Sequence, residues 1–249
     1  MKSKIESVEG IVLTETNYSE SSKILNVLTK EHGLIGIISK GCRNIKSKLR
    51  GVSRKLIYGK FNIYYTEDSL STLIDVDVIN SYNNILTNLD SITFASYILE
   101  LTYQVIKQNN DEEIFEILKS SLEKINDGYD ANVIVDIVEI KYLDFLGVRP
   151  NIDGCSICGS DKNIMTLNHD YGGFICANCY TEGYIVKDLT IKLIRMFYYV
   201  DIDKISKIDV KRENLKELNY FLSEYYDKYT GIYLKSKKML EKITNFVES

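Results

Sequence analysis

Two pairs of cysteines are the feature that most restricts how this chain can fold. Cys155 and Cys158 form one C-x2-C pair, and Cys176 and Cys179 form a second pair after 17 intervening residues. Each pair can place two sulfurs on one side of a metal ion, and this spacing is typical of four-cysteine zinc sites. Because four protein ligands leave no position for a catalytic water, we predict one structural zinc ion per chain, held by a small ribbon within residues 150–185.

Other uses of these cysteines fit the pattern less well. A dithiol redox site needs one C-x-x-C at a strand-to-helix junction, whereas this chain has two matched pairs. A zinc deaminase needs a His-x-Glu motif, and neither His32 nor His169 is followed by glutamate two residues later. A zinc hydrolase would require an open coordination position. An iron–sulfur cluster also accepts four thiolates, so the spacing alone leaves the metal open. Cys42 has no partner motif.

Composition indicates a folded, ordinary globular chain. Hydrophobic residues make up 45% and charged residues 27% of the 249 residues, which excludes wholesale disorder. No stretch reaches the 18 apolar residues that a spanning helix needs, and the start of the sequence lacks the apolar segment of a signal peptide. We therefore expect a cytoplasmic protein without a membrane partner, and reduced cysteines rather than disulfides.

The first 80 residues alternate in the manner of short strands. Apolar runs separated by glycines and turn residues predict strands near 11–13, 24–28, 34–38, 61–65 and 74–78. Five short antiparallel strands in about 80 residues fit a small barrel of the oligonucleotide/oligosaccharide-binding type, the OB-fold. We predict this barrel as a first domain, residues 1–80.

The rest of the chain follows a helical period. Apolar residues recur at helical spacing near 92–106, 114–125, 134–145, 189–197 and 215–229, and Asp111 and Asp188 are placed to cap two of these helices. The predicted fold class is therefore α+β: an N-terminal OB-fold barrel followed by a helical domain, residues 81–249, with the four-cysteine zinc ribbon inserted in it.

Charge is distributed unevenly between the two parts. Residues 1–80 hold 12 Lys/Arg and 9 Asp/Glu, whereas the whole chain has a net charge of −4. Residues 40–60 contain no acid and eight cations: Lys40, Arg43, Lys46, Lys48, Arg50, Arg54, Lys55 and Lys60. Together with the neighbouring aromatic Tyr64, on which a base could stack, these cations are the predicted DNA-binding residues. A solvated charged surface without a ligand is the simpler alternative.

Several segments together resemble the RecO family of bacterial DNA repair proteins. The resemblance spans essentially the full length, and the order and spacing of its segments are more specific than any one of them. These segments are Gly10-Ile11-Val12-Leu13, Tyr18-Ser19-Glu20-Ser21, Leu28-Thr29-Lys30-Glu31-His32-Gly33, Ser39-Lys40-Gly41-Cys42-Arg43 continuing into Lys46-Ser47-Lys48, and Leu146-Gly147-Val148-Arg149-Pro150 leading into Cys155-x-x-Cys158-Gly159.

The resemblance implies both a fold and a function. It implies an N-terminal DNA-binding barrel, a helical domain and a zinc ribbon. It also implies a protein that binds single- and double-stranded DNA, anneals complementary strands, associates with RecR, and helps RecA replace single-strand-binding protein. Such a protein is not an enzyme, takes no small-molecule substrate, and works in the cytoplasm at the nucleoid. The alternative that we retain is a zinc-containing interaction scaffold that contacts no nucleic acid.

Overall fold

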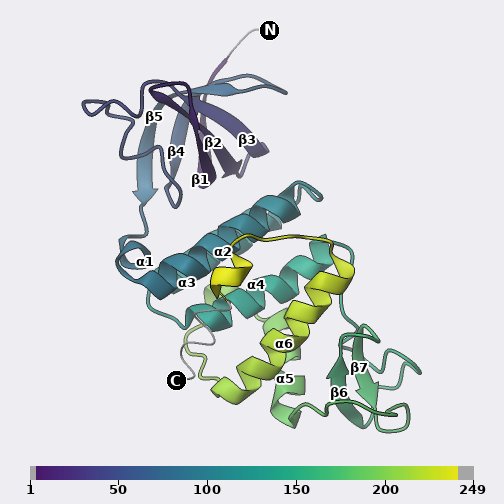
Figure 1. Cartoon of the computed structure of the whole chain (residues 1–249). Coiled ribbons are helices and arrows are strands. Elements are labelled where there is room, and N and C mark those ends of the chain that lie inside the picture. The colour runs from purple at the N-terminus through teal and green to yellow at the C-terminus, as the bar shows by residue number, and fades with distance from the viewer. Residues whose placement is uncertain (1–3, 241–249) are drawn as a thin grey trace. The chain divides into compact units, whose positions relative to one another are not determined.

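The computed structural model describes residues 4–240 and has the α+β architecture that the sequence predicts (Figure 1). Strands come first, helices follow, and a two-stranded ribbon lies between two of the helices. The elements are β1 (Lys4–Tyr18), β2 (Ser22–Thr29), β3 (Gly33–Ser39), β4 (Tyr58–Tyr65), β5 (Ser71–Asn80), α1 (Asn83–Thr87), α2 (Leu89–Ile106), α3 (Glu113–Asn126), α4 (Ala131–Phe145), β6 (Ile164–Asn168), β7 (Gly173–Cys176), α5 (Asp188–Tyr199), the 3-10 turn η1 (Ile202–Lys204) and α6 (Arg212–Tyr229). Within this range, none of the helices combines the length and apolar character needed to span a bilayer.

Strands β1 to β5 form a closed barrel in the order β1-β2-β3-β5-β4, which is the order of an OB-fold. β1 is longer than the sequence predicts, with 15 residues, because its first half pairs with β4 and its second half with β2. An irregularity between Val12 and Thr14 bends the strand where it changes partner. The barrel closes through a short parallel contact in which Ile37 and Ile38 of β3 face Ser71 and Thr72 of β5.

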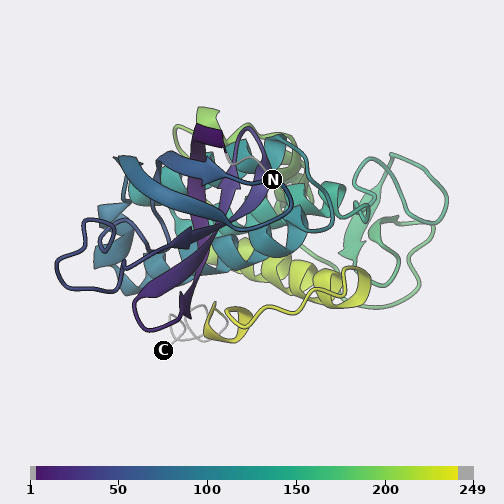
Figure 2. The same cartoon turned by 90° about the horizontal axis from the view of Figure 1, so that it is seen from above.

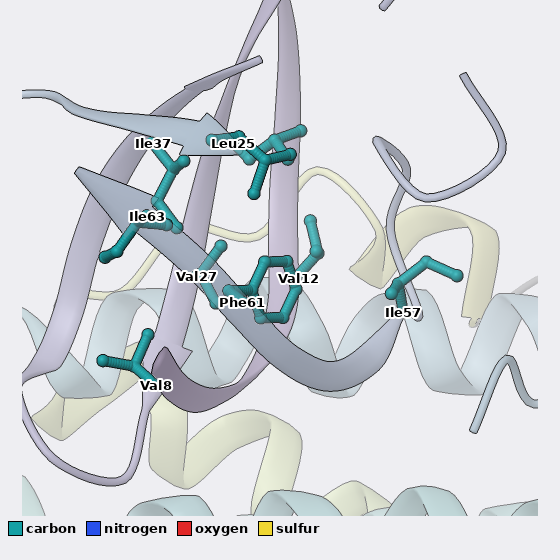
Figure 3. Packing of buried hydrophobic residues seen from close by; sticks show 9 residues of the cluster. Val8, Val12, Leu25, Val27, Ile37, Ile57, Phe61 and Ile63 are labelled. Atoms are coloured by element: carbon teal, nitrogen blue, oxygen red, sulfur yellow. The ribbon is translucent and has the colours of Figure 1, made fainter. Parts of the chain in front are cut away.

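Alternating side chains fill the inside of the barrel, as period-two strands require. Figure 3 shows this core, in which residues from all five strands and from the chain before β4 meet: Val8, Val12, Leu25, Val27, Ile37, Ile57, Phe61, Ile63 and Leu73. Leu49, from the connection between β3 and β4, packs against the same cluster. The long β3–β4 connection is therefore anchored to the core.

Packing divides the chain into two compact units. Unit 1 runs to Asp127, so that α1, α2 and α3 pack with the barrel, and it includes the segment that starts at Ser236. Unit 2 spans Gly128–Lys235 and contains the ribbon and the remaining helices. In unit 1 the rings of Tyr58 and Phe115 meet edge to face at 6.5 Å. The predicted change from strands to helices falls between β5 and α1, and independent folding of residues 1–80 stays a prediction.

Helices α5 and α6 of unit 2 are joined by one buried carboxylate. Glu217 of α6 accepts hydrogen bonds from the Thr190 hydroxyl at 2.5 Å, the Tyr184 hydroxyl at 2.7 Å and the Lys187 backbone N–H at 3.0 Å. The expectation that Asp188 caps this helix is wrong: α5 starts at Asp188, and its N-cap residue Lys187 makes no side-chain cap hydrogen bond. From outside the helix, Glu217 instead accepts hydrogen bonds from the backbone N–H of Lys187 and the hydroxyl of Thr190, and so fixes the start of α5.

Replacing Glu217 by alanine should destabilise unit 2 by about 2 kcal/mol, because three hydrogen bonds to a charged acceptor are lost together. Burial opposes ionisation of Glu217, but its hydrogen bonds with Thr190, Tyr184 and Lys187 outweigh this and lower its pKa below 4.5. Its contribution is therefore complete above pH 4.5 and is lost as the pH falls through the folded-state pKa. Hydrogen exchange of the α5 and α6 amides in the parent and in Glu217→Ala, at pH 7 and at low pH, measures this contribution. An equal difference between the two proteins at pH 7 and at low pH would contradict it.

Candidate nucleic-acid interface and metal centre

The connection between β3 and β4, residues 40–57, is an ordered loop rather than a loose one. Successive tight turns fix its backbone: Asn44 N–H donates to the Gly41 carbonyl at 3.1 Å, and Ser47 N–H donates to the Asn44 carbonyl at 3.0 Å. The hydroxyls of Ser39 and Ser53 meet at 2.7 Å inside the protein. Cys42, which has no partner motif in the sequence, is buried. We call residues 40–57 the cationic loop.

The cationic loop turns its charges outward. Of the eight predicted DNA-binding cations, Arg54 is half-buried and the other seven are exposed. No ion pair among residues 4–240 involves any of the eight. Arg43 donates to the Ser19 carbonyl at 3.1 Å and Arg54 to the Lys55 carbonyl at 3.3 Å, which orients their guanidinium groups without neutralising them. The loop is thus a fixed positive surface open to a polyanion.

The other two predicted contact residues lie apart from this loop on β4. Lys60 pairs in register with Glu9 of β1 and Asp77 of β5, so its charge stands between two acids on the outer face of the barrel. Tyr64 lies four residues further along β4 and is 44% exposed, beside Ile5 of β1. The structure therefore groups the seven cations of the cationic loop, and it places Lys60 and Tyr64 elsewhere on the barrel surface.

The four cysteines of unit 2 converge as their spacing predicts. Their sulfur atoms all lie within 4.8 Å of one another, and those of Cys158 and Cys176 are 3.7 Å apart. Zinc–sulfur bonds of about 2.3 Å in a tetrahedron require sulfurs about 3.8 Å apart, so the cluster fits such an ion. All four are free thiols rather than disulfides. The site can bind a metal ion, and its four protein ligands complete a tetrahedral shell.

Tight turns hold each cysteine pair. Gly159 follows the first pair with φ +77°, and its N–H donates to the Cys155 carbonyl at 2.8 Å. In the second pair, Cys179 N–H donates to the Cys176 carbonyl at 3.1 Å. Ribbon strands β6 and β7 pair antiparallel, with Ile164 opposite Cys176, and bring the two turns together. Glycine is needed after the first pair because a side chain is strained at this φ.

The electrostatics of the cluster favour a bound cation. Burial opposes ionisation of Cys155, but the backbone N–H groups of Cys158 and Cys176 outweigh this and lower its pKa to about 6. Hydrogen bonding with Cys158 and burial raise the pKa of Cys179 to about 12. One thiolate in the cluster thus makes a second one costly, because like charges repel at this distance. A metal cation among the sulfurs removes that cost.

Arg149, in the Leu146–Pro150 segment of the RecO-like pattern, holds the chain where it enters the ribbon. Its guanidinium lies 4.4 Å from the centre of the Tyr198 ring and 2.8 Å from a carboxylate oxygen of Asp153. Arg195 of α5 donates to the Ile152 carbonyl at 2.7 Å. Arg149 therefore has a structural role in unit 2, which its sequence pattern alone did not reveal.

The fold and the two sites together define a class of protein. A closed barrel with OB-fold strand order bears an unpaired cationic loop, and a separate helical unit bears a ribbon with a four-thiol metal site. Barrels of this type that present cations and exposed aromatic residues are typical of oligonucleotide-binding proteins. The chain is thus an OB-fold protein with a helical, metal-ribbon unit.

Comparison with known proteins identifies the family within that class. The family model described as "Recombination protein O N terminal" matches residues 1–82, and "Recombination protein O C terminal" matches residues 86–238. The chain is 36% identical to DNA repair protein RecO of Bacillus pumilus over 239 residues, covering 94% of this chain and 93% of the relative. It is 34% identical to the protein of that name from Bacillus subtilis over 94% and 93% of the two chains, and 32% identical to that from Listeria monocytogenes over 96% and 95%. The chain belongs to the RecO family of DNA repair and recombination proteins, which confirms the resemblance.

Proposed function

We propose that this chain is a mediator of DNA repair by homologous recombination that binds single- and double-stranded DNA and anneals complementary strands. With RecR, it would help to load RecA on DNA covered by single-strand-binding protein, in the cytoplasm at the nucleoid. The observation that supports this most is the cationic loop, because six of its seven cations are exposed, its backbone is held by tight turns, and its cations form no ion pair among residues 4–240.

Annealing by this surface follows from elementary electrostatics. Two DNA strands repel each other through their phosphates, and cations between them reduce that repulsion so that base pairing can proceed. The sequence contains no G-x-x-x-x-G-K-[ST] motif for nucleotide hydrolysis, and we propose that annealing needs no ATP. In the metal site all four positions of a tetrahedral ion would be filled by cysteines, which supports a structural zinc and a non-enzymatic protein. Lys60 and Tyr64 stay predictions of a further contact along β4.

The salt dependence of single-strand binding tests direct contact with DNA. If about five cations of the chain meet phosphates, the logarithm of the association constant should fall with the logarithm of salt concentration with a slope of roughly −3.5. Fluorescence anisotropy of a labelled oligonucleotide between low and moderate salt measures this slope. A chain that binds no oligonucleotide at low salt would instead favour the protein-interaction scaffold.

A further inference from the structure

Two large side chains are exposed at the cationic loop, one within it and one on the neighbouring strand end. Ile45, between Arg43 and Lys46, is 85% exposed, and Tyr18, at the end of β1, is 49% exposed. A single exposed apolar residue is common on protein surfaces and indicates nothing by itself. These two gain significance because both lie at the junction of two loops that contact each other.

The junction joins the cationic loop to the β1–β2 connection, residues 19–21. Arg43 donates from its backbone N–H to the Ser21 carbonyl at 2.8 Å and from its guanidinium to the Ser19 carbonyl at 3.1 Å. Gly41 N–H donates to the Ser22 hydroxyl at 3.3 Å. Figure 2 shows both connections on the same side of the barrel. Tyr18 directly precedes Ser19 in the chain, and Ile45 follows Arg43 by two residues.

The exposed position of Ile45 is fixed by the loop around it. Cys42 is buried on one side of it in the sequence, and Leu49 packs against the barrel core on the other. The turn closed by Ser47 N–H and the Asn44 carbonyl, at 3.0 Å, contains Ile45. The side chain is therefore held out in water before any ligand arrives, and binding would cost little further ordering of the backbone.

We propose that Tyr18 and Ile45 contact unstacked bases of a single strand whose phosphates bind the cations of the cationic loop, and that this contact makes the surface prefer single-stranded over duplex DNA. The inference rests on the proposed DNA-binding function. In a duplex the base faces are stacked on one another, so an aromatic ring or an apolar side chain reaches them only after unstacking. In a single strand the faces are accessible, and stacking depends little on sequence. Glu20, exposed two residues after Tyr18 in the chain, disfavours phosphates at that point and so favours bases there.

The test replaces both side chains by alanine in the full chain. We expect the dissociation constant for a single-stranded oligothymidine to rise about 100-fold in Tyr18→Ala/Ile45→Ala, because each of the two lost base contacts costs about tenfold. The constant for a blunt duplex of the same length should change less than twofold. The salt slope for the single strand should stay as in the parent, since no phosphate contact is removed.

The chain offers a matched control with the same two residue types. Ile79 and Tyr233 are 51% and 69% exposed and lie outside the loop junction. We expect Ile79→Ala/Tyr233→Ala to bind the single strand within twofold of the parent. The inference is overturned if Tyr18→Ala/Ile45→Ala has no effect, weakens single strand and duplex equally, or is matched by the control pair. A parent chain that binds no single strand overturns the proposed function and this inference together.

Discussion

Strand annealing will fall to the spontaneous rate when Lys46, Lys48, Arg50 and Lys55 of the cationic loop are replaced by glutamate. All four side chains are exposed, so the exchange should leave the barrel folded. It removes up to four phosphate contacts and adds four repulsive charges, which should weaken single-strand binding on the order of 100-fold at low salt and reduce the salt slope by about 3. Annealing of two complementary labelled strands, followed by energy transfer between the labels, measures the rate.

A second variant separates the position of the charges from their number. Lys162, Lys192, Lys207 and Lys211 of unit 2 are also exposed, and replacing them by glutamate changes the net charge by the same amount. This control should keep most of the annealing activity, since local phosphate contacts act over about a Debye length of 10 Å. Arg43 is left intact in both variants because it joins the cationic loop to the β1–β2 connection. Equal loss in both variants would remove the cationic loop from the mechanism.

Lys60 provides an internal comparison within the barrel. In the sequence it ends the acid-free run, but in the fold Glu9 and Asp77 flank it on β1 and β5. Neither acid is near Lys60 in the sequence, and only the strand register brings them together. Sequence reasoning could therefore predict that residues 40–57 carry a group of cations, because they follow one another in one segment. It could not predict the surroundings of a residue on β4.

The same distinction between local and distant contacts explains which features of the helical unit could be predicted from the sequence. The four cysteines were predictable because each pair is a local turn and the ribbon between them is short. The contact that fixes the start of α5 was not, since Glu217 reaches Lys187 and Thr190 from a different helix. The buried face of α5 was only partly predicted: Leu193 and Phe197 are buried, whereas Leu189 and Met196 are exposed. A few apolar residues in an amphipathic helix are compatible with more than one buried face. Packing against the neighbouring helices decides which face is buried.

The β1–β2 connection shows a signal that the sequence did contain. Ile45 is an isolated apolar residue within a run of cations, and Tyr18 lies five residues beyond the first predicted strand, 11–13. Neither position follows the period of an element that could bury it. When an apolar residue does not fit the spacing of any helix or strand, its exposure can be predicted from the sequence. That the two segments carrying these residues meet was seen only from the hydrogen bond between Arg43 and Ser21.

Removal of the metal should unfold the ribbon and leave the barrel intact. Elemental analysis of the purified chain should find about one zinc ion per molecule. Iron in place of zinc would instead favour an iron–sulfur cluster. The free energy of zinc binding to such four-ligand sites is about 10 to 16 kcal/mol in isolated peptides, and this free energy stabilises the folded state. After chelation, hydrogen exchange of β6, β7 and the two cysteine turns should approach that of an unfolded segment, while exchange of the barrel amides should not change.

Single substitutions distinguish loss of the metal from loss of any thiol. Cys176→Ser removes one of four ligands at a buried position and should abolish stoichiometric metal binding, with the same loss of ribbon protection that chelation causes. Cys42→Ala, a buried cysteine in unit 1, should keep both the metal and the ribbon. In the ribbon, Asp170 pairs with Lys228 of α6 at 2.6 Å and Tyr229 donates to the His169 carbonyl at 3.1 Å. If these contacts alone kept the ribbon protected in Cys176→Ser, the metal would not be its structural centre.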